Sequence, residues 1–325
     1  IAQTKKKLTT KKTTKTIIID GNLDENDWKD AEIATDFIMY DPDNGKAIDL
    51  KKKTDVKILY DDQAIYISAM LYDDAPSKIM KEITERDDFG SSDTFGIYIN
   101  GYNDGQQDFR FFVTAAGGQV DCLATEQLGE DYSWNAIWES KVKITEFGWA
   151  VEMKIPYAAL RFSNEAQQTW GLNFVREIRR DRQTYTWTHV DSKIGAVIPQ
   201  AGVLNGIQNI KTPTRLFLIP YASFYLNGSE HQKAKGEFKG GLDIKYGIND
   251  AFTLDAILVP DFGQTKFDNV ILNLGPFEQQ FNENRPFFTE GTDLFSKGDL
   301  LYSRRIGQTP NFYPDLAENE SIKDY

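Results

Sequence analysis

The feature that most constrains the fold is a long succession of short segments in which apolar and polar residues alternate, separated by polar turns. Alternation with a period of two residues is typical of a strand that is buried on one face and wet on the other. Many such strands joined by regular turns predict an antiparallel β-sandwich over residues 17–210. In chain order the segments read TIIID, DVKILY, AIYISAMLYDD, TFGIYIN, DFRFFVT, ESKVKIT, GWAVEMKIP and WGLNFVREIRR.

The connections between these segments support the same interpretation. NGYNDGQQ (100–107) lies between two predicted strands and contains Asn, Asp and Gly, which predicts a hairpin turn. Helical signals are confined to DENDWKDA (24–31) and PYAALRF (156–162), each long enough for one or two turns. We therefore expect an all-β chain.

The N-terminal residues differ in composition from the rest. TKKKLTTKKTTKT (4–16) holds six lysines and no acidic residue. Like charges repel and stay solvated, so residues 1–16 are predicted to form a flexible tail. Contact of these lysines with acidic lipid or glycan is the second interpretation. The opening IAQ resembles the remnant of signal-peptide cleavage and predicts an exported protein.

The character of the chain changes after residue 211. EFKGGLDIKYGI (237–248) and FTLDAILVPDFGQ (252–264) predict long hairpins that resemble strands of an outer-membrane β-barrel. A soluble antiparallel sheet with one wet face fits the same pattern. Three strands cannot close a barrel, so residues 211–325 are interpreted as the truncated N-terminal part of a membrane β-barrel domain. The apolar face of the first strand is predicted to hold Phe238, Leu242, Ile244, Tyr246 and Ile248.

Composition narrows the classes of partner. The formal net charge is -12 and the pI is about 4.8, which argues against nucleic acid because phosphate binding needs a basic face. No run approaches about 18 consecutive apolar residues, so no transmembrane helix is predicted. Cys122 is the single cysteine, which excludes an intramolecular disulfide and predicts a small buried residue.

Catalytic motifs are scarce. The two histidines, His189 and His231, lie far apart and outside any HExxH pattern, and neither a GxSxG elbow nor a phosphate-binding Gly-rich loop is present. Glu152 and Asp121 are candidates for the carboxylate pair of a retaining glycosidase, which needs a separation of about 5 Å. Each is better interpreted as a solvated residue on a strand face. The sequence therefore predicts no enzyme.

Three acidic stretches carry the hard oxygen ligands that calcium prefers. They are DGNLDEND (20–27), DPDNG (41–45) and RDDFGSSD (86–93), and none matches the EF-hand loop. Asp and Asn next to Gly also form ordinary turns, which is the alternative interpretation. Calcium is the only cofactor that the sequence suggests, and the candidate ligands are Asp20, Asp24, Asp41 and Asp43.

The order of the N-terminal segments resembles carbohydrate-binding module family 9. IDGNLDENDWKDA looks like the opening of that family, which begins IDG-x-LDE-x-x-W-x-x-A. A single motif of this kind is weak, but six in the family's order are specific. The resemblance implies an antiparallel β-sandwich for residues 17–210. The other five are DVKILYDDQAIYISAMLYDD, RDDFGSSDTFGIYING, FFVTAAGGQVDC, WNAIWESKVKITEFGWAVEMKIPYAALRF and TWGLNFVREIRR.

The C-terminal part is similar to a different family. LVPDFGQTKFDNVILNLGPFEQQFNENRPFFTEGTDLF followed by LLYSRRIG resembles the DUF5916-type domain, which is of unknown function and follows such sandwiches in bacterial cell-envelope proteins. Those longer proteins look like outer-membrane β-barrels. The resemblance implies an envelope protein whose N-terminal domain is of a sugar-binding type.

Tryptophans are the main candidates for a sugar site. The resemblance implies a sugar ring clamped between two aromatic faces, with polar side chains that read its hydroxyls. Trp134 with Tyr132 can form one wall of such a clamp, and Trp138 is kept as a candidate although it is expected to turn inward. The tryptophans predicted to lie in the core are Trp28, Trp149 and Trp170.

Polar side chains that hydrogen-bond to the sugar hydroxyls are expected in the loop before TFGIYIN. Arg86, Asp87 and Asp93 lie where the resemblance places polar residues near the cleft. An arginine beside a carboxylate can hydrogen-bond to sugar hydroxyls in a bidentate manner. An ordinary surface ion pair is the equal alternative.

These observations predict a secreted, non-catalytic protein that binds carbohydrate or glycan at the bacterial cell envelope by aromatic stacking and polar contacts. The first alternative is a structural or partner-docking component of an outer-membrane barrel complex, contacting other envelope proteins through PFEQQFNENRPFFTEG (276–291). The second alternative is a glycosidase, which needs two acids converging on the tryptophan cleft.

Overall fold

The structure is a computed structural model of the chain. It describes residues 5–127, 129–132, 134–211, 215–229, 232–248, 252–258, 272–273, 275–276, 279–281 and 302–305. The chain divides into two compact units, unit 1 (Ile1–Thr214) and unit 2 (Arg215–Tyr325). The described residues form strands and short 3-10 turns, which confirms the predicted all-β fold. None of the helices in this part of the chain could span a bilayer.

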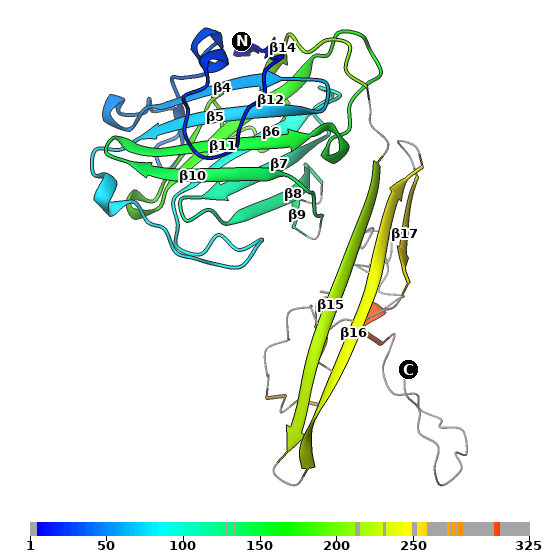
Figure 1. The fold of residues 1–325 in the computed structure, drawn as a ribbon. Coiled ribbons are helices and arrows are strands. Elements are labelled where there is room, and N and C mark those ends of the chain that lie inside the picture. The colour runs from blue at the N-terminus through cyan, green and yellow to red at the C-terminus, as the bar shows by residue number, and fades with distance from the viewer. Residues whose placement is uncertain are drawn as a thin grey trace. The chain divides into compact units, whose positions relative to one another are not determined.

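Unit 1 is a sandwich of two sheets, which we call sheet A and sheet B (Figure 1). Sheet A runs β1-β14-β12-β6-β7-β8-β9, and β13 pairs with both β12 and β3. All of its pairs are antiparallel except β1 with β14, so the predicted sandwich is confirmed. Its strands are β1 (Lys7–Thr9), β3 (Ile38–Asp41), β6 (Thr94–Asn100), β7 (Gln107–Thr114), β8 (Gln119–Thr125), β9 (Gly129–Asp131), β12 (Trp170–Ile178), β13 (Gln183–Thr186) and β14 (Gly202–Asn205).

Sheet B is smaller and forms the second layer. It runs β10-β11-β5-β4-β2, and its pairs are antiparallel except β2 with β4. The segment 100–107 forms the turn between β6 and β7, as predicted. The strands of sheet B are β2 (Lys11–Lys12), β4 (Thr54–Tyr60), β5 (Ala64–Tyr72), β10 (Glu139–Thr145) and β11 (Gly148–Pro156).

The two segments with helical signals contain only single 3-10 turns. DENDWKDA holds η1 (Asn26–Asp30), and PYAALRF holds η4 (Tyr157–Ala159). The remaining 3-10 turns are η2 (Leu50–Lys52), η3 (Pro76–Lys78), η5 (Arg179–Asp181), η6 (Ile198–Gln200) and η8 (Ser303–Arg305).

The core lies between the two sheets and follows from the alternation along the strands. On β6 and β7 every second residue is buried in one large cluster with residues of β4, β5 and β11. Trp28, Trp149 and Trp170 are all buried, as predicted, although Trp28 belongs to a separate small cluster with Ile17 and Leu59. Cys122 is free and buried, as predicted.

One charged side chain joins the two layers. Arg176 of β12 points into the sandwich and is fully buried. Its guanidinium donates to the backbone oxygens of Lys52 (2.6 Å) and Tyr72 (2.7 Å) and to the hydroxyl of Thr54 (3.0 Å), all on or next to strands of sheet B. A buried guanidinium needs such partners, because leaving it unpaired is costly. Arg176 therefore acts as a clamp between the sheets.

The N-terminal segment is not a flexible tail, so that prediction was wrong from Lys7 onward. β1 pairs in parallel with β14, and β2 pairs in parallel with β4. Leu8 is 1% exposed and Thr10 is 3% exposed, while Lys7, Lys11 and Lys12 on either side of them are exposed. Sequence reasoning missed this short strand because the lysines occupy its outward-facing positions and made the whole segment look like a charged tail.

Unit 2, as far as it is described, is an antiparallel sheet of three strands in the order β15-β16-β17. The strands are β15 (Arg215–Ser229), β16 (Gln232–Gly247) and β17 (Thr253–Ile257). The register pairs Leu218 with Ile244 and Phe224 with Phe238, which confirms a shared apolar face. Most of the predicted docking loop (276–291) lies outside the described residues.

Candidate functional site

Several of the predicted site residues lie around one buried carboxylate, that of Asp121. Asp121 lies on β8 and faces into the sandwich opposite Phe111. Its Oδ2 accepts hydrogen bonds from Arg86 Nη2 (2.8 Å), Trp138 Nε1 (2.9 Å) and the backbone N–H of Ala136 (3.0 Å). Burial raises the pKa of Asp121 to about 6, and the Arg86 charge opposes that rise. We call this arrangement the Asp121 centre.

Arg86 uses its other donors to tie neighbouring loops together. Nε donates to Asn135 Oδ1 (3.0 Å), and Nη1 donates to Gln119 Oε1 (2.7 Å). Asp87 accepts from the backbone N–H of Asp121 (3.3 Å), and its carboxylate lies 3.7 Å from Arg86 Nε. The groups that Arg86 and Asp87 bind in the structure therefore belong to the protein itself. Their role in contacting sugar stays a prediction.

Trp134 and Trp138, the two tryptophans predicted as possible sugar contacts, both contact the core. Trp138 is 5% exposed, and its ring meets Phe111 edge-on at 5.5 Å, so it turns inward as predicted. Trp134 is half-buried, and its ring lies 5.1 Å from Phe109 and 5.9 Å from Phe111. The Trp134 ring therefore packs against the phenylalanines of β7 and stays partly exposed, and its role as a stacking wall stays a prediction.

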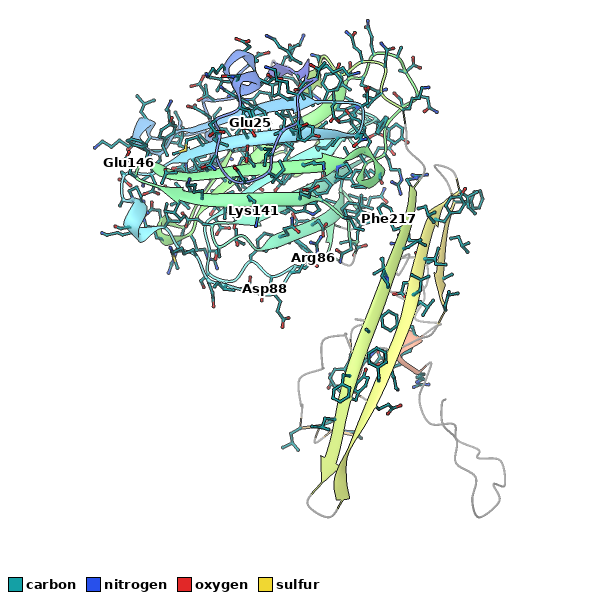
Figure 2. The ribbon with its side chains drawn as sticks, in the orientation of Figure 1. Glu25, Arg86, Asp88, Lys141, Glu146 and Phe217 are labelled. Atoms are coloured by element: carbon teal, nitrogen blue, oxygen red, sulfur yellow. The ribbon has the colours of Figure 1, made fainter. Side chains whose placement is uncertain are left out.

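A surface hollow of about 400 Å³ adjoins the Asp121 centre. Arg86 and Lys141, both labelled in Figure 2, line it. None of the residues around the hollow is aromatic, so it offers polar contacts but no stacking platform. The other lining residues are Ile19, Gly117, Gln119, Glu139 and Ser140.

Asp93 does not join this group. It is 1% exposed, and its Oδ1 accepts from the backbone N–H of Arg179 (3.0 Å). Burial raises the pKa of Asp93 to about 6, and the charges of Arg176 and Arg180 oppose that rise. Asp93 therefore belongs to the buried ion network beside the Arg176 clamp, and its grouping with Arg86 was wrong.

A second candidate site lies on the face of sheet A that points away from the core. Because the side chains of a strand alternate, Tyr98 of β6 and Phe112 of β7 face the opposite way from Ile97 and Phe111. Phe89, from the preceding loop, packs edge-on against Phe112 at 5.2 Å, and the Tyr132 ring lies 6.1 Å from Phe89. A Cβ at Gly96 would lie 2.4 Å from the Phe112 ring, so only glycine leaves room for it.

An ion network adjoins these rings. Register pairs Arg110 with Tyr98, and the guanidinium lies 4.2 Å from the Tyr98 ring centroid. Arg110 Nε donates to Asp108 Oδ1 (2.7 Å), and Nη1 donates to Glu130 Oε1 (2.6 Å). Tyr132 donates its hydroxyl to Glu130 Oε2 (2.5 Å). We call the rings and this network the Arg110 face.

The Arg110 face combines exposed ring area with fixed polar groups. Tyr132 is 36% exposed, and Phe89 and Tyr98 are half-buried. Burial raises the pKa of Asp108, while the Arg110 charge opposes the rise. Sequence reasoning identified only Tyr132 among these residues. The alternation in TFGIYIN and DFRFFVT was the available signal, because it already places Tyr98, Arg110 and Phe112 on one face.

The two acids considered for glycosidase chemistry are not solvated. Asp121 and Glu152 are both fully buried, which corrects the expectation of solvated strand faces. Asp121 lies on sheet A, whereas Glu152 lies on β11 of sheet B and accepts from the backbone N–H groups of Gly21 (2.8 Å) and Asp20 (3.0 Å). Each acid therefore has its own structural partners.

The four calcium candidates are exposed, and Asp41 is the last residue of β3. Asp20 Oδ1 accepts from the backbone N–H of Asn22 (2.8 Å), and Asp43 lies 3.4 Å from Lys46 Nζ. Asp24 and Asp41 are exposed. Within the described residues, no group of three or more His, Cys, Asp or Glu side chains is placed to hold a metal ion. Calcium binding stays a prediction.

Comparison with known proteins finds two family models that match the chain. The model of the family described as carbohydrate family 9 binding domain-like matches residues 19–190, more than half of the chain. The model of a domain of unknown function, DUF5916, matches residues 212–325. No curated protein matches the chain.

Three solved structures resemble the chain at low identity. A family 9 carbohydrate-binding module from Caldicellulosiruptor kristjanssonii, in complex with cellotriose, is 16% identical, with 63% of this chain and 95% of that chain covered and a TM-score of 0.47. The same module with glucose gives 16% identity, coverage of 64% and 100%, and a TM-score of 0.46. A candidate carbohydrate-binding protein from Bacteroides uniformis gives 11% identity, coverage of 63% and 100%, and a TM-score of 0.49.

The matched residues of the first family model coincide with the strands of sheets A and B from β3 to β13 and include the Asp121 centre and the Arg110 face. On this evidence the chain belongs to the carbohydrate family 9 binding domain-like family.

Proposed function

We propose that unit 1 binds carbohydrate without catalysing a reaction, and that the Arg110 face is the binding surface. Membership of the family supports the ligand class. The observation that carries the choice of surface is the meeting of partly exposed rings with the Arg110–Asp108–Glu130 network. The hollow beside Arg86 lacks aromatic lining, which makes it the weaker candidate.

The mechanism follows from the chemistry of a pyranose. One face of the sugar presents C–H groups, which pack against the electron-rich faces of aromatic rings such as Tyr132 and Phe89. The hydroxyls at the edge of the sugar need hydrogen-bond partners, and the carboxylate oxygens of Glu130, whose side chain is 36% exposed, can accept from them. Asp108 is 2% exposed and serves to position Arg110. Arg110 holds both carboxylates in place, so little side-chain entropy is lost on binding.

A non-catalytic role is part of the proposal. Retaining glycosidases need two carboxyl groups about 5 Å apart, one of which holds a proton. At the Arg110 face, the guanidinium lies between Asp108 and Glu130 and pairs with both. Asp108 is also only 2% exposed, so its carboxyl group cannot reach the glycosidic oxygen of a bound sugar as a general acid must.

The test is calorimetric titration of the full chain with a panel of neutral oligosaccharides. Tyr132→Ala is expected to weaken binding about tenfold, because it removes one stacking ring. Tyr102→Ala is the matched control, since Tyr102 is a similarly exposed tyrosine (43%) on the β6–β7 turn. If the folded protein binds no sugar, the proposal is wrong. Binding that is lost in Lys141→Ala but kept in Tyr132→Ala would move the site to the hollow.

A location at the cell envelope completes the proposal. Its support is the exposed apolar face of β15, β16 and β17, because soluble monomeric proteins seldom expose a large continuous apolar surface. A partner-docking role without sugar binding is the second candidate function, and the same face favours it. Absence of sugar binding, together with retention of envelope attachment, would select that candidate.

A further inference from the structure

The sheet of unit 2 exposes a continuous apolar face, which we call the unit 2 apolar face. Phe224 and Leu226 of β15 are 69% and 68% exposed, and Phe238 of β16 is 73% exposed. A soluble protein seldom leaves so many large apolar side chains together in water. Within the paired strands, the other large members of the face that are at least one-third exposed are Leu216, Leu218, Tyr246 and Leu254.

The register shows that these side chains form one surface. Leu216 lies opposite Tyr246, which lies opposite Leu254, so all three strands contribute. Farther along, Phe224 lies opposite Phe238. Residues directly opposite each other on neighbouring strands project to the same side of the sheet. The apolar side chains therefore run along the hairpin as a stripe.

The other side of the same sheet carries the charges. Lys239 lies 3.9 Å from Glu237 and 5.4 Å from the Tyr225 ring centroid, and Lys245 lies 3.9 Å from Asp255. These side chains alternate with the apolar ones along β16 and β17. The charged side chains and the unit 2 apolar face therefore lie on opposite sides of the sheet. The same side also carries Phe217, Ile219 and Tyr221 of β15, so what distinguishes the unit 2 apolar face is that it holds no charged residue in the paired strands.

We propose that the unit 2 apolar face contacts the hydrocarbon of a lipid bilayer. The run 216–226 on β15 has the length of about 9–11 residues that a strand needs to cross the hydrocarbon layer. The only polar side-chain atom on the paired part of this face is the Tyr246 hydroxyl. A protein interface typically holds about one hydrogen bond per 100–200 Å². Lipid hydrocarbon forms no hydrogen bonds, so a face almost without polar side-chain atoms suits lipid better than a protein partner or a second copy of the chain.

The inference does not depend on sugar binding by unit 1. The first test is flotation of the full chain with uncharged phosphatidylcholine vesicles, which give the lysines of residues 5–15 no acidic lipid to bind. The wild type is expected to float with the vesicles. Phe224→Asp combined with Phe238→Asp is expected to lower the bound fraction at least tenfold, roughly the cost of placing charges on a lipid-facing strand.

The matched control is Ser223→Asp, on the same strand and opposite Lys239 on the charged face. It adds one negative charge, where the Phe224→Asp, Phe238→Asp variant adds two, and is expected to leave the bound fraction within about twofold of the wild type. A wild type that stays with the lipid-free fraction overturns the inference. So does a stable dimer in lipid-free buffer that the Phe224→Asp, Phe238→Asp variant dissociates, because the second copy would then be the occupant.

A second measurement avoids charged substitutions and so guards against misfolding. Because Cys122 is the only cysteine, a Cys122→Ala background allows one polarity-sensitive label to be placed at Leu218→Cys or at Ser223→Cys. Vesicles are expected to shift the emission of the Leu218 label to the blue and to leave the Ser223 label unchanged. Equal shifts at both positions, or no shift at either, would contradict lipid contact by this face.

Discussion

Sheet A of unit 1 and the sheet of unit 2 are built from the same alternating pattern, yet their apolar faces end in different surroundings. Phe95 of β6 and Phe111 of β7 are fully buried, whereas Phe224 of β15 and Phe238 of β16 are 69% and 73% exposed. Sheet B covers the first face, and among the described residues no second sheet covers the other. Alternation decides which residues share a face, while a second layer decides whether that face becomes a core.

The largest expected effect is the difference in stability loss between alanine substitutions of one phenylalanine from each of the two apolar faces. Phe111→Ala leaves a cavity between the two sheets and is expected to lower the free energy of unfolding by about 3–5 kcal/mol. Phe224→Ala removes a ring that is already in water and is expected to cost less than about 0.5 kcal/mol. Urea unfolding followed by far-ultraviolet circular dichroism measures both. Equal losses would mean that the two faces are covered alike.

The next effect tests what holds the two layers of unit 1 together. Arg176→Met keeps the bulk of the side chain but removes donors from the oxygens of Lys52 and Tyr72, and we expect a loss of about 3 kcal/mol. Arg179→Met is the control, because the Arg179 side chain is 48% exposed and its pair with Glu177 contributes little. A neutral Arg176→Met in equilibrium unfolding would show that the clamp is dispensable.

A smaller effect is expected where the N-terminal segment closes the edge of the sandwich. Leu8→Ala is expected to lower the free energy of unfolding by about 2 kcal/mol, because Leu8 is 1% exposed in the core. Lys7→Ala, one residue away and exposed, should change it by less than about 0.5 kcal/mol. Thermal unfolding of the two variants distinguishes a paired strand from a tail, since a tail would make both substitutions neutral.

The smallest effect concerns pH and a buried acid of sheet B. Burial raises the pKa of Glu152 to about 7, above its ordinary value of 4.5, although the N–H groups of Gly21 and Asp20 oppose the rise. Between these values the folded chain holds a proton that the unfolded chain has released. Stability from this group is therefore full at low pH and falls as pH rises from about 5 to about 7.

Glu152→Gln cannot ionise, so it removes this contribution. Relative to the wild type, the variant is expected to gain about 1 kcal/mol between about pH 5 and about pH 8. Glu139→Gln, on the exposed edge strand β10, is the matched substitution and should show no such gain. Urea unfolding at several pH values measures the difference, and parallel stability curves for Glu152→Gln and wild type would contradict the prediction.

The candidate site was predictable only in part. Arg86, Asp87 and Trp138 do lie together, because all three hydrogen-bond to Asp121 of β8, although their loops are far apart in the sequence. The Arg110 face was missed because its members come from a loop, two paired strands and a later turn. Only the register of β6 with β7 places Tyr98 beside Arg110.

Sequence by itself determined the local features of this protein: where strands form, which residues of each strand share a face, and that Trp149 and Trp170 are core residues. These follow from alternation, which acts over a few residues. Tertiary structure alone decided that β6 pairs with β12, that Asp121 and Glu152 are buried, and that the lysine-rich start of the chain forms strands. Each of these depends on which distant segment covers a given face or edge, and a periodic pattern carries no information about that partner.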